Sequence, residues 1–327
     1  MDPYLYSPIY TQRRRQQERA DLKRIGRVAG CCIVGYVVLE SLVSVPLMFE
    51  PLRSLYIGNA TFQAAFNMVL SVVGVLVPFL IGGLYLEKHN RAEIFCFGKP
   101  ASMSLAATAV ALGFFICMAG DYLTSILVSA AESVGVDLTM PEYALPKDLF
   151  GRFVYTLMVA VLPPLVEEFA VRGAIMQPLR KFGDPFAIVA SAFVFAVLHG
   201  NLVQAPFAFV AGIGMGYAVC VTGTIWTGVA IHFLNNFYSV VLQYMVEDIP
   251  DEAQLERIYL PIMVTLVALS ALGGVAHVLL CKKKQLHKPE DPSLLTIGEK
   301  TGALLLNLPM IIAILTMLWV TKQYVNL

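Results

Sequence analysis

Nine apolar runs follow one another along the chain, separated by short polar segments. They cover residues 28–49, 64–86, 103–131, 151–179, 185–200, 203–222, 224–245, 258–281 and 303–321. A membrane-spanning helix needs about 20 predominantly apolar residues, and most of the runs have this length. The third run is longer and contains Asp121, and the fifth is short. The pattern predicts an all-α fold, a polytopic transmembrane helical bundle of about nine spans.

Lysine and arginine are distributed unevenly over the segments between the runs. Cytoplasmic segments of membrane proteins carry an excess of these two residues. With the N-terminus in the cytoplasm, 17 of the 23 Lys and Arg fall on the inner side and 5 on the outer side, while Arg172 lies within a run. A missing span would mix the two groups from that point onward. We therefore predict a multi-pass protein of the cell membrane with an N-in, C-out topology.

The overall composition agrees with a chain that is surrounded by the lipid bilayer. Hydrophobic residues make up 57% of the sequence and charged residues 14%, whereas a soluble domain has about 25% charged residues. The net charge is zero, so nothing in the charge balance favours a nucleic-acid partner. The six cysteines form no Cys-x-x-Cys pair, and we interpret them as packing residues of the helices.

The fourth run contains three charged residues that a helix would bring together. A charge at the centre of a membrane costs about 2.5–3.5 kcal/mol on insertion scales, which makes each of them a candidate functional residue. Glu168 and Arg172 have a four-residue spacing that favours an ion pair, and this leaves the adjacent Glu167 unpaired. Pro163 and Pro164 precede them by about one turn and are expected to bend the helix and free backbone carbonyl groups.

Histidines in the fifth and seventh runs are the second polar feature. Phe195 and His199 share one face of a helix, and so do His232 and Asn236. Glu167 and His199 would each lie roughly 22–26 Å from the turn between their helices, so they can face each other in an antiparallel hairpin. The uncharged turn before the seventh run can dip into the membrane and bring His232 to the same level.

Each of these residues has a structural explanation when it is taken alone. A single His or Asn in a span is most often an interhelical hydrogen-bonding group, and a Glu–Arg pair is most often structural. Together, however, Glu167, the two histidines and Asn236 lie on three helices that can converge, and they predict one shared polar site. Two further acidic residues in or near runs, Glu40 and Asp121, have no evident partner in the sequence and receive no role.

The four residues of this site suit the hydrolysis of a carbonyl compound such as a peptide bond. A carboxylate in an apolar wall, with an imidazole beside it, can activate water. A second imidazole and an amide can donate hydrogen bonds to a developing oxyanion.

Zinc is the alternative chemistry for the same residues. Glu167, His199 and His232 are a ligand set that suits Zn²⁺ with an open position for water. No His-Glu-x-x-His motif is present. Zinc-bound histidines usually need an acceptor for their second ring nitrogen, and no carboxylate lies beside either histidine in the sequence. We therefore expect no cofactor, with zinc as the alternative.

At these residues the chain resembles the CPBP family of membrane-embedded endopeptidases, which includes the CAAX prenyl proteases and bacteriocin-processing proteins. The family pattern is E-E-x-x-x-R, then F-x-x-x-H, then H-x-x-x-N or H-x-x-x-D. The chain reads E-E-F-A-V-R, F-A-V-L-H and H-F-L-N-N in this order, within roughly residues 150–240. One departure is Val171, where many members have Phe before the motif Arg, and this neighbour is expected to pack rather than to react.

The resemblance implies a role for each matching residue. Glu167 would activate water with help from His199, and His232 and Asn236 would hold the oxyanion. Three other motif residues would support the site structurally: Glu168, Arg172 and Phe195.

The function predicted from these features is that of an intramembrane endopeptidase. Its substrate would be a peptide or a lipid-modified protein in the membrane. One alternative is a transporter that uses the polar cluster as an ion site, for which paired repeats are expected but not visible. Another is a non-catalytic immunity or binding protein. The predicted segments are a basic cytoplasmic N-terminal segment (1–27), N-terminal transmembrane helices (28–149), a catalytic CPBP-like transmembrane core (150–245) and C-terminal transmembrane helices (246–327).

The N-in, C-out topology predicts that the C-terminus is accessible from outside the cell. In a cysteine-free background, a single cysteine introduced beside Asn326 should react with a membrane-impermeant thiol reagent in intact cells. A cysteine placed in the 1–27 segment, as the control, should react only after permeabilisation. Protection of the C-terminal cysteine in intact cells would contradict the predicted topology.

Overall fold

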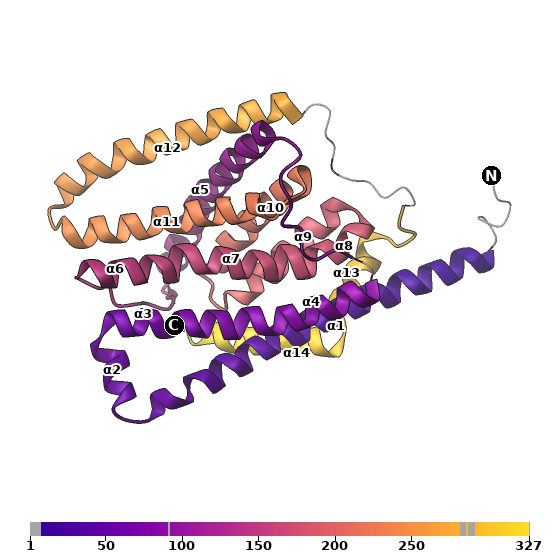
Figure 1. Ribbon diagram of the computed structural model, residues 1–327, viewed down its shortest axis with the longest axis horizontal. Coiled ribbons are helices and arrows are strands. Elements are labelled where there is room, and N and C mark those ends of the chain that lie inside the picture. The colour runs from indigo at the N-terminus through magenta and orange to yellow at the C-terminus, as the bar shows by residue number, and fades with distance from the viewer. Residues whose placement is uncertain (1–7, 91, 282–285, 287–291, 327) are drawn as a thin grey trace.

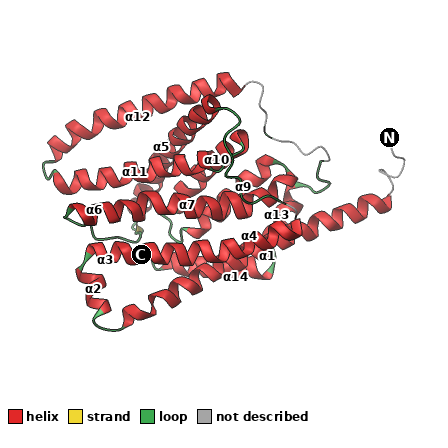
Figure 2. Cartoon of the chain, in the orientation of Figure 1, coloured by secondary structure: helices red, strands yellow, loops and turns green. Residues whose placement is uncertain are grey.

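The nine apolar runs are helical over most of their length in the computed structural model of the protein, which describes residues 8–90, 92–281, 286 and 292–326. The helices lie side by side in a bundle (Figures 1 and 2). A two-stranded antiparallel sheet joins β1 (Asp137–Leu138) to β2 (Val325–Asn326). This is the architecture of an all-α membrane protein.

The first three runs form the helices of the N-terminal part. These are α1 (Pro8–Ser44), the 3₁₀ turn η2 (Val45–Met48), α2 (Leu52–Gly58), α3 (Ala60–Ser71), the π-helical turn η3 (Val72–Leu76), α4 (Val77–Asn90) and α5 (Met103–Ser133).

The fourth run is one long helical stretch with several changes of winding, and we call residues 149–182 the fourth span. It consists of α6 (Leu149–Thr156), the π-helical η4 (Leu157–Val161), α7 (Leu162–Glu168), the π-helical η5 (Phe169–Met176), α8 (Gln177–Leu179) and the 3₁₀ turn η6 (Arg180–Phe182). The remaining helices are α9 (Asp184–Leu198), α10 (Ala205–Thr222), α11 (Trp226–Asp248), α12 (Glu252–Leu280), α13 (Ile297–Leu305) and α14 (Leu308–Lys322).

Six helical stretches of the described residues are long and apolar enough to cross a membrane. A seventh is added if α13 and α14, which meet at an angle of 76°, count as one broken span. The helices of the other two runs, α9 and α11, are not among these stretches. α9 has only 15 residues, and α11 carries the polar residues His232, Asn235 and Asn236. The number of nine crossings stays a prediction, although each run has its helix.

The basic N-terminal segment is continuous with the first span. α1 begins at Pro8 and runs without a break to Ser44, so the predicted boundary at residue 28 lies inside a helix. Arg15 binds Glu299 in the first turn of α13 at 2.6 Å, and Arg19 binds the same carboxylate. The backbone N–H of Thr296 and the guanidinium groups of Arg19 and Arg15 hold the pKa of Glu299 at about 2.

Contacts between the ends of helices and strands fall into two groups that agree with the predicted sides. Lys181 binds Asp21 at 2.6 Å, which joins two predicted inner segments. Arg152 binds Asp248 through two hydrogen bonds, and β1 pairs with β2, which joins predicted outer segments. The orientation itself stays a prediction. Five of the basic residues on which it depends lie outside the described residues: Arg91, Lys282, Lys283, Lys284 and Lys288.

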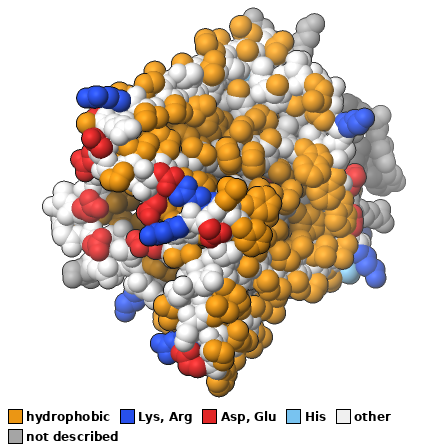
Figure 3. All heavy atoms as spheres, turned by 60° about the vertical axis from the view of Figure 1, so that its left-hand side comes forward, with side chains coloured by type: hydrophobic (Ala, Val, Ile, Leu, Met, Phe, Trp, Pro, Cys, Tyr) orange, Lys and Arg blue, Asp and Glu red, His pale blue; other side chains and the backbone are white. Residues whose placement is uncertain are grey.

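The outer surface of the bundle is largely apolar. Figure 3 shows hydrophobic side chains over most of the visible face, with charged side chains gathered mainly in one region of it. α12, which packs along α5 at the edge of the bundle (Figure 1), exposes Leu272, Val275 and Val278 by 60% or more. Such exposure would be unfavourable in water, and it suits a helix that faces lipid.

The centre of the bundle lies where α10 packs against α9 and α5. On another side α1 packs against α14 and α13. Gly30 permits this crossing, because a Cβ atom there would lie 2.4 Å from the backbone nitrogen of Met310 and 2.5 Å from the carbonyl carbon of Pro309. The C-terminal helices are therefore held against α1 by contact between backbones.

We predict that Gly30→Ala destabilises the protein by about 1–3 kcal/mol, since the added methyl group meets backbone atoms that cannot rotate away. Thermal unfolding of the purified protein in detergent measures this as a lower Tm. Gly58→Ala is the matched control, because no atom lies within 4 Å of a Cβ at that position. Equal Tm values for both variants and the wild type would show that α14 does not pack on α1 in this way.

Candidate active site

The fourth span changes its winding on both sides of Glu167. In a regular helix the N–H of residue 163 would donate to the carbonyl of residue 159, but Pro163 has no N–H. The carbonyl oxygen of Val159 accepts instead from Nδ2 of Asn236 at 2.9 Å. The expected freeing of a carbonyl group is therefore confirmed, and its partner is a residue of α11.

Glu168 and Arg172 form the predicted ion pair, and both side chains are completely buried. Nη1 of Arg172 donates to Oε1 of Glu168 at 2.8 Å. Nη2 donates to the carbonyl oxygen of Gly212 in α10 at 3.2 Å. The guanidinium carbon also lies 4.4 Å from the centre of the Phe195 ring in α9. The arginine thus contacts a charge, a carbonyl and an aromatic face from three helices, while its Nε has no hydrogen-bond partner among the described residues.

Glu168 has a second partner that its sequence position does not suggest. Its Oε1 lies 3.3 Å from Nδ1 of His232. α11 comes close enough for this contact because residue 228 is a glycine, where a Cβ would lie 2.5 Å from Oε2 of Glu168. An ionised carboxylate can only accept, so this contact places a proton on Nδ1 of His232.

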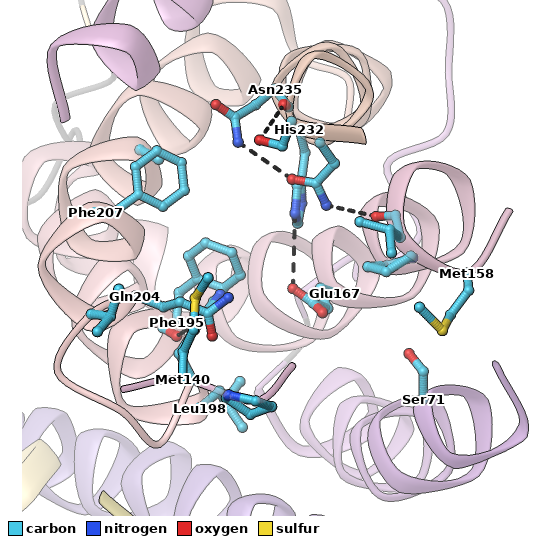
Figure 4. A pocket seen from close by; sticks show the side chains of 18 of the residues that line it. Ser71, Met140, Met158, Glu167, Phe195, Leu198, Gln204, Phe207, His232 and Asn235 are labelled. Atoms are coloured by element: carbon cyan, nitrogen blue, oxygen red, sulfur yellow. Dashed lines mark hydrogen bonds and ion pairs between the residues drawn. The ribbon is translucent and has the colours of Figure 1, made fainter. Parts of the chain in front are cut away.

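The other ring nitrogen of His232 points toward Glu167. Nε2 lies 4.0 Å from Oε2 of Glu167 (Figure 4). Both side chains line a cavity of about 580 Å³, together with Phe195 and His199 of α9. The side chain of Glu167 is 23% exposed whereas that of Glu168 is fully buried, so Glu167 is the carboxylate that the cavity can reach.

His199 is fixed by the way in which α9 ends. The helix stops at Leu198, and Gly200 has the positive φ of 62° that ends many helices. This leaves the carbonyl oxygen of Phe195 open, and Nδ1 of His199 lies 2.8 Å from it. A carbonyl oxygen can only accept, so Nδ1 carries the proton and the neutral ring has its lone pair on Nε2.

The structure brings all seven predicted site residues to one region. Glu167, His199, His232 and Asn236 line the cavity. Of the three predicted supporting residues, Arg172 contacts both Glu168 and Phe195, and Phe195 also lines the cavity. Phe195 also packs edge-on against the rings of His199 and His232.

Two polar features of the site do not follow from the motifs. The first is that Asn236 already donates to Val159, so it joins α11 to the fourth span. The second is that Glu40 and Asp121, which had no role in the sequence, line the same cavity as Glu167. Their position inside apolar runs was a signal that they could have a function, but only the packing of the helices brings them to this site.

The fit of a metal ion depends on two observations that point in opposite directions. Both histidines have an acceptor at Nδ1, so the sequence-based reason for rejecting zinc is wrong. However, no group of three His, Cys, Asp or Glu side chains that could hold a metal ion is found within the described residues. Glu167, His199 and His232 share a cavity but do not converge as ligands.

The two neighbouring carboxylates are expected to respond differently to the same substitution. Glu168→Gln leaves the buried Arg172 without its counter-charge, and we expect a loss of about 3–5 kcal/mol in stability. Glu167→Gln removes a charge that no Lys or Arg pairs with in the described structure, so its Tm should stay close to that of the wild type. Thermal unfolding in detergent measures both. Equal destabilisation by the two variants would contradict the division between a structural and a reactive carboxylate.

Comparison with known proteins agrees with the geometry of this region. Residues 149–238, from α6 into α11, match the family described as type II CAAX prenyl endopeptidase, Rce1-like. No curated protein and no solved structure gives a significant match. The matched stretch includes all three motifs and all seven site residues, and it confirms the resemblance inferred from the sequence. Residues 149–238 therefore have the features of the CPBP membrane endopeptidases, and they lie in a chain with several helices long and apolar enough to cross a membrane.

Proposed function

We propose that this protein hydrolyses a peptide bond of a membrane-associated peptide or lipid-modified protein, with Glu167 as the residue that activates water. The observation that carries the proposal is the placement of Glu167. It lies in a cavity beside two imidazole rings, 4.0 Å from one of them, while the neighbouring Glu168 takes the charge of Arg172. A carboxylate in this position is available to accept a proton from water.

The reaction begins when water binds between Glu167 and His199. Nε2 of His199 has its lone pair free in the neutral ring, so it can accept one hydrogen bond from the water and orient it. Glu167 takes the second proton while the oxygen attacks the carbonyl carbon of the substrate. The proton then passes to the nitrogen of the leaving amine, the C–N bond breaks, and the acyl part keeps the hydroxyl oxygen.

His232 and Asn236 are the proposed donors to the oxyanion. Nδ1 of His232 faces Glu168, so Nε2 donates to the oxyanion when the ring carries both protons. Asn236 has one N–H engaged with Val159, and its second N–H remains for the substrate. Asn236 therefore combines a positioning role with a catalytic one.

The cavity suits a substrate that is partly in the membrane. It lies within the helical bundle, and its wall includes Leu70, Leu198, Phe207 and Met215. Apolar side chains of this kind bind an apolar peptide segment or a lipid group. A C-terminal prenylated peptide and a lipid-modified peptide precursor are both compatible with this wall, and the cell membrane is the proposed location.

We predict that Glu167→Gln abolishes proteolysis, and that His232→Ala and Asn236→Ala each lower turnover by about 10²–10³ because a donor to the oxyanion is lost. Peptide fragments from membranes that contain the wild type are compared by mass spectrometry with those from membranes that contain each variant. Glu132→Gln, in an exposed position of α5 outside the cavity, is the matched control and should cleave like the wild type. Identical fragments for the wild type and Glu167→Gln would refute the protease proposal.

A second experiment tests whether the activity needs a metal: the purified active enzyme is titrated with a chelator, and its metal content is measured by elemental analysis. We expect activity to persist without stoichiometric zinc. If zinc is lost together with activity, and activity returns when zinc is added back, then Glu167, His199 and His232 bind a metal instead.

A further inference from the structure

The cavity has an excess of acidic side chains. Three carboxylates line it, from Glu40 in α1, Asp121 in α5 and Glu167 in the fourth span. Neither Lys nor Arg is among the described residues that line it. The catalytic proposal uses only Glu167, so the two other carboxylates need a separate explanation.

Asp121 lies in a part of the wall where three helices meet. Cys117, Asp121 and Thr124 follow each other at intervals of one turn and line the cavity from one face of α5. α10 and α11 both pack against α5, and they bring Phe207 and Asn235 to the same cavity. In Figure 4, Phe207 and Ser71 lie on opposite sides of Glu167, so the cavity extends from the catalytic carboxylate toward this wall.

The two unexplained carboxylates differ in their partners. Glu40 lies beside Tyr36 of the same helix, which can donate to it. The side chain of Asp121 makes no hydrogen bond or ion pair with any residue that the structure describes. An unpaired carboxylate within an apolar helix is costly, and the cost is offset when a ligand supplies the opposite charge.

Three residues that line this cavity have a buried polar atom without a partner among the described residues, and one of these atoms is a donor, Nδ2 of Asn67 in α3. Oγ1 of Thr124 and Oδ1 of Asn235 accept or donate no hydrogen bond within the described structure, although the two residues are only 7% and 5% exposed. Buried polar atoms are nearly always hydrogen-bonded. The Thr124 hydroxyl can accept or donate and Oδ1 of Asn235 can only accept, so one donor group between these two oxygens would satisfy both.

We propose that Asp121 binds a cationic group of the substrate, a lysine or arginine side chain or a free amine near the scissile bond, with Thr124 and Asn235 as additional acceptors. An ammonium group has three donors and no acceptor, which complements one carboxylate and two neutral oxygens. The inference rests on the proposed peptidase function and adds a substrate class to it: peptides with a positive charge beside the bond that is cut.

The test measures binding separately from cleavage. The probes are synthetic lipid-anchored peptides that differ at one position, with either lysine or its uncharged analogue norleucine. A second pair of peptides both contain norleucine and differ only at the N-terminus, which is either a free amine or acetylated. Affinities are measured with the Glu167→Gln protein, which is expected not to cleave, in nanodiscs. The measurement is repeated with two double variants, which combine Glu167→Gln with Asp121→Asn or with the control substitution Glu132→Gln.

We expect the lysine or the free-amine peptide to bind roughly 10–100-fold more tightly than its neutral counterpart, as a partly buried charge pair implies. Asp121→Asn should remove this preference, leave binding of the neutral peptide unchanged, and keep the Tm of the protein. Glu132→Gln should keep the preference. The peptide that shows it identifies the cation as a side chain or a terminal amine.

Equal binding of charged and neutral peptides, or a preference that survives in Asp121→Asn, would overturn the inference. The peptidase proposal is judged separately, by whether the wild type cleaves and Glu167→Gln does not. A wild type that cleaves without any charge preference refutes only the role of Asp121. A preference that depends on Asp121, without cleavage by the wild type, supports the binding site and refutes the peptidase.

Discussion

The buried ion pair between Glu168 and Arg172 is the interaction on which the rest of the site depends. Two charges without exposure to solvent need partners for their remaining donors and acceptors. Oε2 of Glu168 and Nε of Arg172 have no hydrogen-bond partner among the described residues, whereas Oε1 of Glu168 and Nη1 and Nη2 of Arg172 are bound. The partners come from different helices: the carbonyl of Gly212 in α10, the ring of Phe195 in α9 and the imidazole of His232 in α11. Satisfying one pair of charges therefore fixes three helices relative to the fourth span, and with them both histidines.

This arrangement gives two adjacent residues of the same type opposite properties. Adjacent positions on a helix point about 100° apart, so one carboxylate is directed into the protein and the other into the cavity. Glu168 is bound on several sides and is suited to hold its neighbours in place. Glu167 lines the cavity without an ion pair to any described Lys or Arg, because its interior neighbour already balances the charge of the arginine.

Much of this site follows from sequence periodicity, because its first contacts are local. The Glu168–Arg172 pair is a four-residue spacing on one helix. Glu167 and His199 are expected at the same level because they lie at similar distances from the turn that joins their two helices. The contacts of His232 with Glu168 and of Asn236 with Val159 could not be predicted, since they depend on how closely α11 approaches the fourth span. That approach is permitted by a glycine at 228, whose importance is visible only when its neighbour is known. The acceptor of His199 was within reach of sequence reasoning, because Gly200 ends the helix and leaves the carbonyl of Phe195 open.

The short sheet between β1 and β2 has a consequence for the wall of the cavity. Thr139 directly follows β1, and its backbone N–H donates to the carbonyl oxygen of Tyr324, just before β2. The next residues along the chain, Met140, Pro141 and Tyr143, form part of the cavity wall. Residues 324–326 are thus hydrogen-bonded to a segment that continues into the cavity wall. A bulky protein fused beyond β2 would therefore act on a segment that leads directly into the cavity wall, whereas the same protein fused before α1 would be separated from the cavity-lining residues Tyr36 and Glu40 by several turns of that helix.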